Sequence, residues 1–178
     1  MRALIIKLHL MIAAFFAPVL LMVALSGGLY LFGQKGQTER TALELPSELT
    51  LSELTPTPEE AVSNLLQTID PDFDFEYLKV SGDLLITRPT SKTYYEINRS
   101  RGDLTVTKVD PDWIKALVEL HKGHGPTSFK QFQKIMAFGL LFIVLSGLWL
   151  GLTAKNLRNN TLLTSFSGLI VFLILAFF

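Results

Sequence analysis

Three long apolar runs without a charged residue restrict this chain to a fold that spans a membrane. Residues 8–32, 135–154 and 161–178 contain no Asp, Glu, Lys or Arg. An α-helix rises ~1.5 Å per residue and a bilayer's hydrocarbon core is ~30 Å thick, so about 20 residues are needed to cross it. The sequence therefore predicts three transmembrane helices, of which the last is the shortest.

A single polar segment separates the first apolar run from the second. All 16 acidic residues lie between Glu39 and Glu119. A segment of this length is near the lower limit for an independent domain, so its hydrophobic core should be small. We expect one soluble domain, inserted between the first and second transmembrane helices.

The soluble segment shows a helical pattern first and strand patterns afterwards. Thr57, Pro58 and Glu60 form a capping box that starts a helix. Its apolar stripe consists of Ala61, Leu65, Leu66 and Ile69. From Phe73 the period changes towards two, which is typical of strands in an antiparallel meander. The predicted strands are residues 75–80, 84–88, 93–97 and 104–109.

A second helix is predicted at the end of the domain. It should begin at Asp110 with Pro111 in its first turn and end at Gly123. Its apolar face would contain Trp113, Leu117 and Leu120. The predicted fold class is thus an α+β membrane protein, with about three transmembrane helices and one domain of helix, antiparallel strands and helix.

The predicted organisation divides the chain into eight parts. They are a cytoplasmic N-terminus (1–7), transmembrane helix 1 (8–33), a linker (34–57), the domain (58–122), a juxtamembrane hinge (123–134), transmembrane helix 2 (135–154), a cytoplasmic loop (155–160) and transmembrane helix 3 (161–178).

Lysine and arginine positions predict the orientation. Arg2 and Lys7 precede the first run, and Lys155 and Arg158 lie between the second and third. The positive-inside rule places both groups in the cytoplasm and the domain outside it. A cleaved signal peptide ending near residues 24–26 is the alternative, but a signal's apolar region has only ~7–15 residues, far fewer than this run.

The three histidines, His9, His121 and His124, all lie at edges of predicted transmembrane helices. Histidine is a common metal and haem ligand and changes charge near neutral pH. The three are therefore the candidate haem ligands. Lys122 lies between His121 and His124 in the sequence, and its positive charge would repel a metal cation bound there. We therefore predict no metal site. There are two alternatives. The histidines could lie at the membrane interface and bond to main chain or lipid headgroups, or His121 and His124 could form a proton-sensing pair.

Other site chemistries find little support. The chain has no cysteine, which excludes disulfides and thiolate ligands. Residues 70–76 alternate carboxylates as a calcium loop does, but the required turn glycine is absent and Ser81 stands where the last glutamate should be. No phosphate-binding glycine loop or hydrolase motif is present, so no catalytic residue is predicted. A formal net charge of +0 gives no support for nucleic-acid binding.

The chain resembles the PepSY-associated transmembrane proteins over most of its length. The resemblance depends on the order of four strings: Lys7-Leu8-His9-Leu10, Tyr94-Tyr95-Glu96-Ile97-Asn98, Leu120-His121-Lys122-Gly123 and Leu145-Ser146-Gly147-Leu148-Trp149. It implies a bacterial inner-membrane protein with a periplasmic PepSY-type domain. Some larger relatives look like haem-containing reductases of ferric-siderophore uptake, and others like regulatory or protease-inhibiting modules. This chain is shorter, with one domain and about three spans.

A haem held by two histidines needs them on opposite faces of the ring, each ~2 Å from the iron. The predicted topology puts His9 and His121 at opposite membrane surfaces, so they would not share one iron. His121 and His124 lie on the same side of the membrane and would not enclose a haem. A haem site would therefore need a second copy, a partner subunit or a membrane span much shallower than the predicted one.

We therefore expect a non-catalytic accessory, scaffolding or regulatory subunit of the bacterial inner membrane. The alternative is a haem-binding electron-transfer component or a ferric-siderophore reductase-like enzyme. The expected partners are the lipid bilayer and other membrane subunits or a second copy. Gly147 and Gly151 stand four residues apart, which suits either helix packing within the chain or a dimer face.

Overall fold

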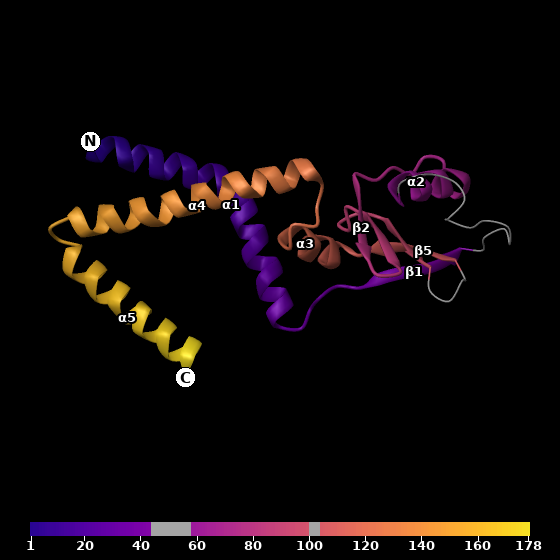
Figure 1. The fold of residues 1–178 in the computed structure, drawn as a ribbon. Helices are drawn as coiled ribbons and strands as arrows, with labels where there is room; N and C mark the ends of the chain where they lie inside the picture. The colour runs from indigo at the N-terminus through magenta and orange to yellow at the C-terminus, as the bar shows by residue number, and fades with distance from the viewer. Residues whose placement is uncertain (44–57, 100–103) are drawn as a thin grey trace. The chain divides into compact units, whose positions relative to one another are not determined.

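The computed structural model describes residues 1–43, 58–99 and 104–178. Three helices are long and apolar enough to cross a membrane: α1 (Arg2–Leu31), α4 (Thr127–Thr153) and α5 (Arg158–Phe177) (Figure 1). Each covers all but the last residue of one of the uncharged runs, so the three predicted spans are confirmed as helices. By contacts the chain forms two units, one of Met1–Leu20 and Lys134–Phe178 and the other of Leu21–Gln133.

In the first unit, α1 packs against α4 at a glycine. A Cβ placed on Gly139 would lie 2.4 Å from Cε2 of Phe16, whose side chain is buried. His9, seven residues before Phe16, bonds to Ser146, seven residues after Gly139. The two segments are therefore antiparallel, and small residues on α4 allow the close approach.

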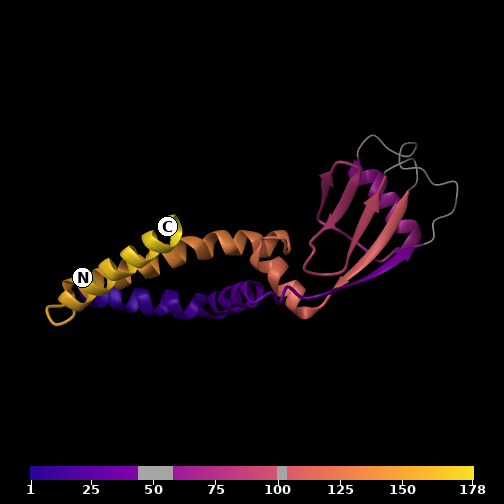
Figure 2. The same cartoon turned by 90° about the horizontal axis from the view of Figure 1, so that it is seen from below.

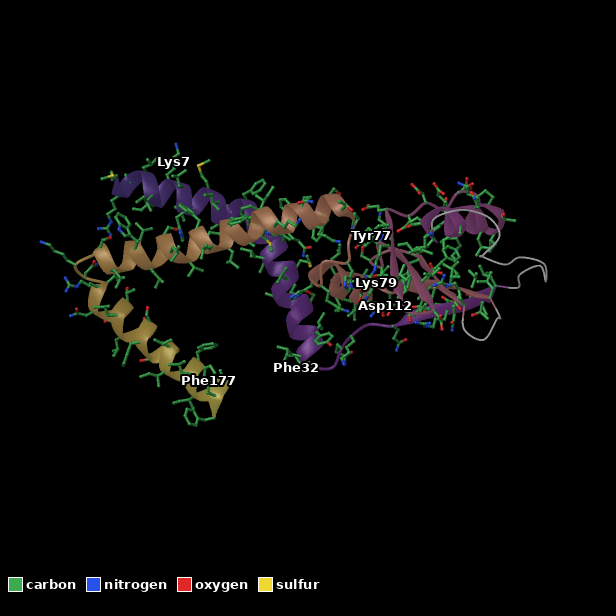
Figure 3. All side chains as sticks on the ribbon, in the orientation of Figure 1. Lys7, Phe32, Tyr77, Lys79, Asp112 and Phe177 are labelled. Carbon is green, nitrogen blue, oxygen red and sulfur yellow. The ribbon has the colours of Figure 1, made fainter. Side chains whose placement is uncertain are left out.

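Both glycines of the four-residue spacing on α4 face residues of this chain. A Cβ on Gly147 would lie 3.4 Å from Cε1 of His9, and one on Gly151 would lie 2.6 Å from Oγ1 of Thr161. The four-residue spacing of Gly147 and Gly151 therefore serves helix packing within the chain. Helix α5 buries none of its residues, and the sticks along it in Figure 3 are mostly carbon, as lipid exposure requires.

The second unit contains a five-stranded antiparallel sheet in the order β1-β5-β4-β3-β2. The strands are β1 (Thr38–Leu43), β2 (Tyr77–Ser81), β3 (Leu84–Arg88), β4 (Tyr94–Asn98) and β5 (Thr105–Pro111). Four of them match predicted strands to within two residues at each end. Strand β1 lies in the range predicted as a linker.

Strand β1 escaped prediction because its side chains carry no alternating apolar pattern. It begins Thr-Glu-Arg-Thr, and most of its residues are exposed. The strand is held in place by main-chain pairing with β5 over residues 38–43. The Arg40 guanidinium also donates two hydrogen bonds to the Glu96 carboxylate on β4. Such pairing leaves little trace in hydropathy.

The hydrophobic core lies between one face of the sheet and α2 (Pro58–Ile69), which lies beside the strands in Figure 2. The helix contributes Val62, Leu65 and Leu66, and the sheet contributes Leu78, Leu85, Tyr95, Ile97 and Val106. The predicted stripe of α2 is thus confirmed at Ala61, Leu65 and Leu66, which are buried. The predicted cap Thr57 lies outside the described residues.

The prediction for the domain's last helix was wrong at its start and on its buried face. Helix α3 comprises Trp113–His121 and is capped by Asp112, whose Oδ1 accepts a hydrogen bond from the Lys115 N–H at 2.7 Å. Asp110 and Pro111 remain in β5 because they pair with β1. Trp113 is 68% exposed, whereas Val118 and Glu119 are buried.

The end of α3 was predicted correctly, but the hinge after it is shorter than expected. Gly123 has a φ of +75°, the left-handed conformation that ends helices. Helix α4 then begins at Thr127, inside the range 123–134 predicted as a hinge. Glu76, from the loop before β2, accepts a hydrogen bond from the Thr127 N–H at 2.6 Å. This carboxylate, distant in sequence, caps the helix.

Candidate functional site

A buried carboxylate occupies the centre of the polar contacts between α3, the sheet and the connection that leads to α4. Glu119 is only 4% exposed. Its Oε2 accepts a hydrogen bond from the Thr90 hydroxyl at 2.7 Å and lies 2.6 Å from Nδ1 of His124. Its Oε1 lies 3.0 Å from Nζ of Lys122 and 3.2 Å from Nζ of Lys115. We call Glu119 and these four partners, together with Arg88, the Glu119 cluster.

Arg88 brings the sheet into the cluster. This buried side chain at the end of β3 donates from Nη1 to the Thr90 hydroxyl at 2.7 Å, and the same nitrogen lies 3.8 Å from Oε2 of Glu119. Three permanent cations therefore surround one carboxylate. Because a charge removed from water must be paired and hydrogen-bonded, loss of either Glu119 or Arg88 would leave the other as a buried charge with fewer partners.

The cluster also holds the short connection between α3 and α4. The His124 N–H donates to the Glu119 carbonyl at 2.9 Å, and the His124 carbonyl accepts from the Thr90 N–H at 3.1 Å. Further along, Nζ of Lys130 donates to the Tyr77 hydroxyl at 2.8 Å. Glu76 and Tyr77 thus fasten the first turns of α4 to the domain, while Glu119 holds the connection that precedes them.

The cluster shifts the pKa values of its two proton-binding groups. Burial is the largest effect on the Glu119 carboxyl and raises its pKa, but the hydrogen bonds it accepts outweigh burial and lower the pKa to about 2. Burial lowers the pKa of His124, and the charges of Arg88 and Lys122 add to this against the opposing effect of Glu119. At pH 7 Glu119 is charged and His124 is neutral.

His121 turns away from the Glu119 cluster and meets α1. Its Nδ1 lies 2.9 Å from Oγ of Ser26, which is 1% exposed. A Cβ on Gly27 would lie 3.1 Å from Cε1 of His121, so the glycine beside the serine makes room for the ring. Both residues belong to the second unit.

His9 makes the same kind of contact within the first unit. Its Nδ1 lies 2.9 Å from Oγ of Ser146 on α4, which is 7% exposed, and its ring lies against Gly147. Two histidines thus each meet a Ser-Gly pair on a membrane helix.

The serine contacts determine which histidine nitrogen carries the proton. The Ser146 hydroxyl donates to the Phe142 carbonyl at 2.6 Å, and the Ser26 hydroxyl donates to the Val23 carbonyl at 3.2 Å. A hydroxyl has one proton, and it is given to a carbonyl that can only accept. We therefore assign the donor role to Nδ1 of both His9 and His121.

The structure separates the histidines that the sequence grouped. His121 bonds to Ser26, and His124, three residues on, bonds to Glu119. Over the described ranges 1–43, 58–99 and 104–178, no group of three or more histidines and acids has a geometry that could hold a metal ion. In the segment resembling a calcium loop, Asp70 accepts from the Tyr95 hydroxyl and Glu76 caps α4.

Sequence reasoning missed the histidines' partners, although a signal was present. The triplet Leu-Ser-Gly occurs at residues 25–27 and again at 145–147, each time inside an uncharged run. A polar residue repeated in that setting favours a hydrogen-bonded helix contact. Glu119 could also have been found, because Lys115 and Lys122 lie on its helix face at spacings of four and three.

Comparison with protein families decides what kind of chain this is. The model of the PepSY_TM-like family matches residues 3–178. This chain belongs to the PepSY_TM-like family. The resemblance inferred from its four short strings is thereby confirmed, and so is the α+β membrane fold. Comparison with curated proteins and with solved structures gives no match.

Proposed function

We propose that this PepSY_TM-like protein is a non-catalytic accessory, scaffolding or regulatory subunit of the bacterial inner membrane. Its domain would lie on the periplasmic side, since Arg2, Lys7, Lys155 and Arg158 favour a cytoplasmic location for the opposite helix ends. Other membrane subunits or a second copy would be its partners.

The observation that carries this proposal is the Glu119 cluster. It ties α3, the loop after β3 and the connection to α4 into one hydrogen-bonded assembly. A displacement of the sheet would reach α4 through these bonds, so a partner bound to the domain could be sensed at a membrane helix. A fastening of this kind suits a regulatory module.

Alkaline phosphatase and green fluorescent protein fusions after Asn98 test the orientation. The proposal expects active phosphatase and dark fluorescent protein. The opposite pattern would place the domain in the cytoplasm and overturn the periplasmic assignment.

Native electrophoresis of gently solubilised membranes tests the accessory role. We expect the wild-type chain in a complex larger than the chain with its detergent, and we expect Glu119→Gln to dissociate it. Glu96→Gln is the matched control, because Glu96 binds Arg40 in an exposed pair of the same domain. If the wild-type chain migrates alone, or if both variants behave alike, the proposed role of the cluster is wrong.

A second candidate is a haem-binding electron-transfer component, favoured by the histidine–serine pairs. A haem ligand needs a neutral ring with a bare nitrogen, and an Nδ1–H bonded to a serine leaves Nε2 in that state. His9 or His121 would each supply one ligand to a separate haem, with the opposing ligand from a second copy or a partner. Bound haem iron would supply one-electron transfer.

Absorption spectroscopy distinguishes the two candidates. Under the accessory proposal, protein purified from haem-replete cells shows no Soret band. Under the second, it shows a band that His121→Ala or His9→Ala removes and that the surface variant Lys79→Ala retains. A band that survives in both histidine variants would exclude these ligands.

A further inference from the structure

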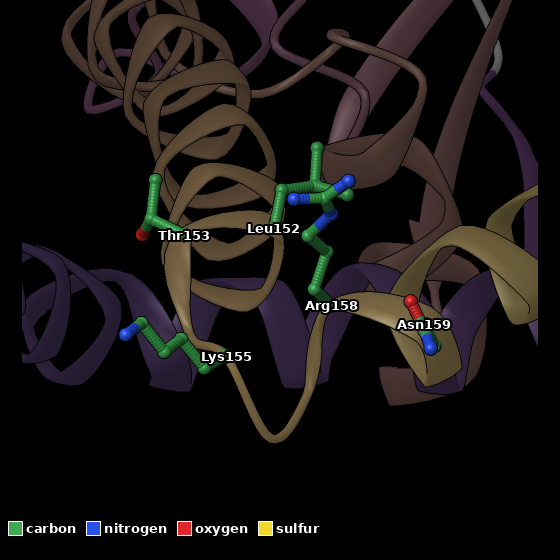
Figure 4. Close-up of a pocket in the computed structure, with 5 residues that line it drawn as sticks. All are labelled: Leu152, Thr153, Lys155, Arg158 and Asn159. Atoms are coloured by element: carbon green, nitrogen blue, oxygen red, sulfur yellow. The ribbon is translucent and has the colours of Figure 1, made fainter.

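The turn between α4 and α5 forms a small basic pocket. It is lined by Leu152, Thr153, Lys155, Arg158 and Asn159, and its cavity volume is about 380 Å³ (Figure 4). This volume lies at the lower end of the ~300–1,000 Å³ range of ligand sites. We propose that this pocket binds the phosphate group of an anionic phospholipid.

The charge of the pocket is not neutralised by the unit that contains it. The unit of Met1–Leu20 and Lys134–Phe178 includes no aspartate or glutamate, because all acidic residues lie between Glu39 and Glu119. Lys155 and Arg158 are both exposed, and within the part of the chain that the structure describes neither forms an ion pair. Two unpaired cations bordering one cavity favour an anionic ligand.

The antiparallel packing of α1 and α4 adds a third cation to this end of the unit. His9 lies opposite Ser146, and Phe16 lies opposite Gly139. Continuing the same pairing brings Arg2 to the level of the last turn of α4. The positive charge at this membrane surface is therefore a property of the fold as well as of the turn.

The side chains of the pocket suit a lipid phosphate. Arg158 can bind two phosphate oxygens with its planar guanidinium, while Lys155 supplies a point charge. Figure 4 shows Arg158 extending beside Leu152, so the cation lies next to an apolar side chain that could contact the glycerol or acyl region. The Thr153 hydroxyl donates to the Trp149 carbonyl at 2.8 Å, so its proton is already engaged.

The location favours a lipid over a free anion. The four-residue turn joins two helices that are both long and apolar enough to cross a membrane, so it lies at the membrane surface, where headgroups are concentrated. Basic pockets between membrane helices are known to recognise anionic headgroups. This inference does not depend on the proposed accessory role.

The test uses the full chain in nanodiscs of phosphatidylcholine with increasing phosphatidylglycerol. Native mass spectrometry counts the retained lipids, and thermal unfolding reports stabilisation. We expect phosphatidylglycerol to be retained and to stabilise the wild type. Lys155→Ala and Arg158→Ala should each weaken retention about fivefold, which corresponds to the contribution of one basic residue near an anionic surface.

Lys35→Ala is the matched control, because Lys35 follows another membrane helix and lies over the Tyr30 ring. It should retain phosphatidylglycerol as the wild type does. Equal retention by the wild type and the double variant Lys155→Ala/Arg158→Ala would overturn the proposal. So would equal stabilisation by inorganic phosphate in pure phosphatidylcholine, since the site would then bind a free anion.

Discussion

The two units satisfy their buried polar groups in different ways. In the second unit, Glu119 is a charged group with five polar partners, drawn from the sheet, a loop and its own helix. In the first, His9 and Ser146 form a single contact between an imidazole ring and a hydroxyl, and the ring lies against Gly147. A charged side chain can be accommodated in the domain, where several polar groups and nearby water stabilise it. A helix within lipid is stabilised instead by uncharged hydrogen-bonded pairs and close packing.

Removal of the central carboxylate should produce the largest effect. Glu119→Ala leaves the buried Arg88 and the partly buried Lys115 without their shared partner, and loss of one side of a buried ion pair costs about 3–5 kcal/mol. We expect a loss of unfolding free energy of that size in a detergent-based unfolding titration. Glu96→Ala, which breaks an exposed pair, should cost about 0–1 kcal/mol. Equal losses would show that the cluster is no more important than a surface ion pair.

Acid should weaken the same cluster over a defined range. The pKa of Glu119 is about 2 in the folded chain and about 4.3 in an unfolded one, so its charged form stabilises the fold above pH 4.3. That contribution, about 3 kcal/mol, is lost as the pH falls from about 4.3 through 2. We expect the stability difference between wild type and Glu119→Gln to shrink across this interval. A difference that is constant with pH would contradict the lowered pKa.

His124 should act in a separate and higher pH range. Its pKa is lowered below the usual 6.5, so the neutral ring stabilises the fold above pH 6.5, and this contribution is lost as the pH falls through the folded-state pKa. Wild type and His124→Gln should therefore differ in the pH dependence of their stability just below pH 6.5. An identical profile for both would show that His124 does not titrate there.

Substitution of one glycine in each unit by alanine would show how well each unit tolerates an added methyl group. Gly36 has a φ of +72°, and a Cβ there would lie 2.2 Å from the Lys115 main-chain nitrogen. Gly139→Ala would instead meet the Phe16 ring, which can rotate. We expect Gly36→Ala to cost about 1–3 kcal/mol and Gly139→Ala to cost less. Thermal unfolding would measure both, and the reverse order would show that the helix pair is the more rigid region.

The smallest effect should come from the serines. Ser146→Ala removes one hydrogen bond between membrane helices, and such bonds contribute about 0.6 kcal/mol on average. Ser26→Ala should cost a similar amount. Ser165→Ala, on the exposed α5, is the control and should leave stability unchanged in a detergent unfolding titration. A loss comparable with that of Glu119→Ala would erase the proposed distinction between charged and neutral pairs.

Much of the fold could be read from local pattern. The spans followed from uncharged runs, four strands from alternation, and α2 from its apolar stripe, because each of these signals is repeated along one segment. The start of α3 and strand β1 could not be found in this way. Both depend on pairing between residues 38–43 and 106–111, which are far apart in the sequence.

The candidate site shows the same limit. The sequence identified His9, His121 and His124 as polar groups at helix ends, but it did not reveal that each ring would bond to a different partner. Those partners, Ser26, Ser146 and Glu119, are brought close only when helices and sheet pack together.

The sequence by itself determined that this is a membrane protein with one inserted α+β domain, since hydropathy and periodicity act locally and additively. Only the tertiary structure decided that a charged cluster fastens the domain to α4 and that serine–glycine pairs receive two of the histidines. Hydrogen bonds of this kind depend on distances of about 3 Å between residues up to 137 positions apart, and no local pattern encodes them.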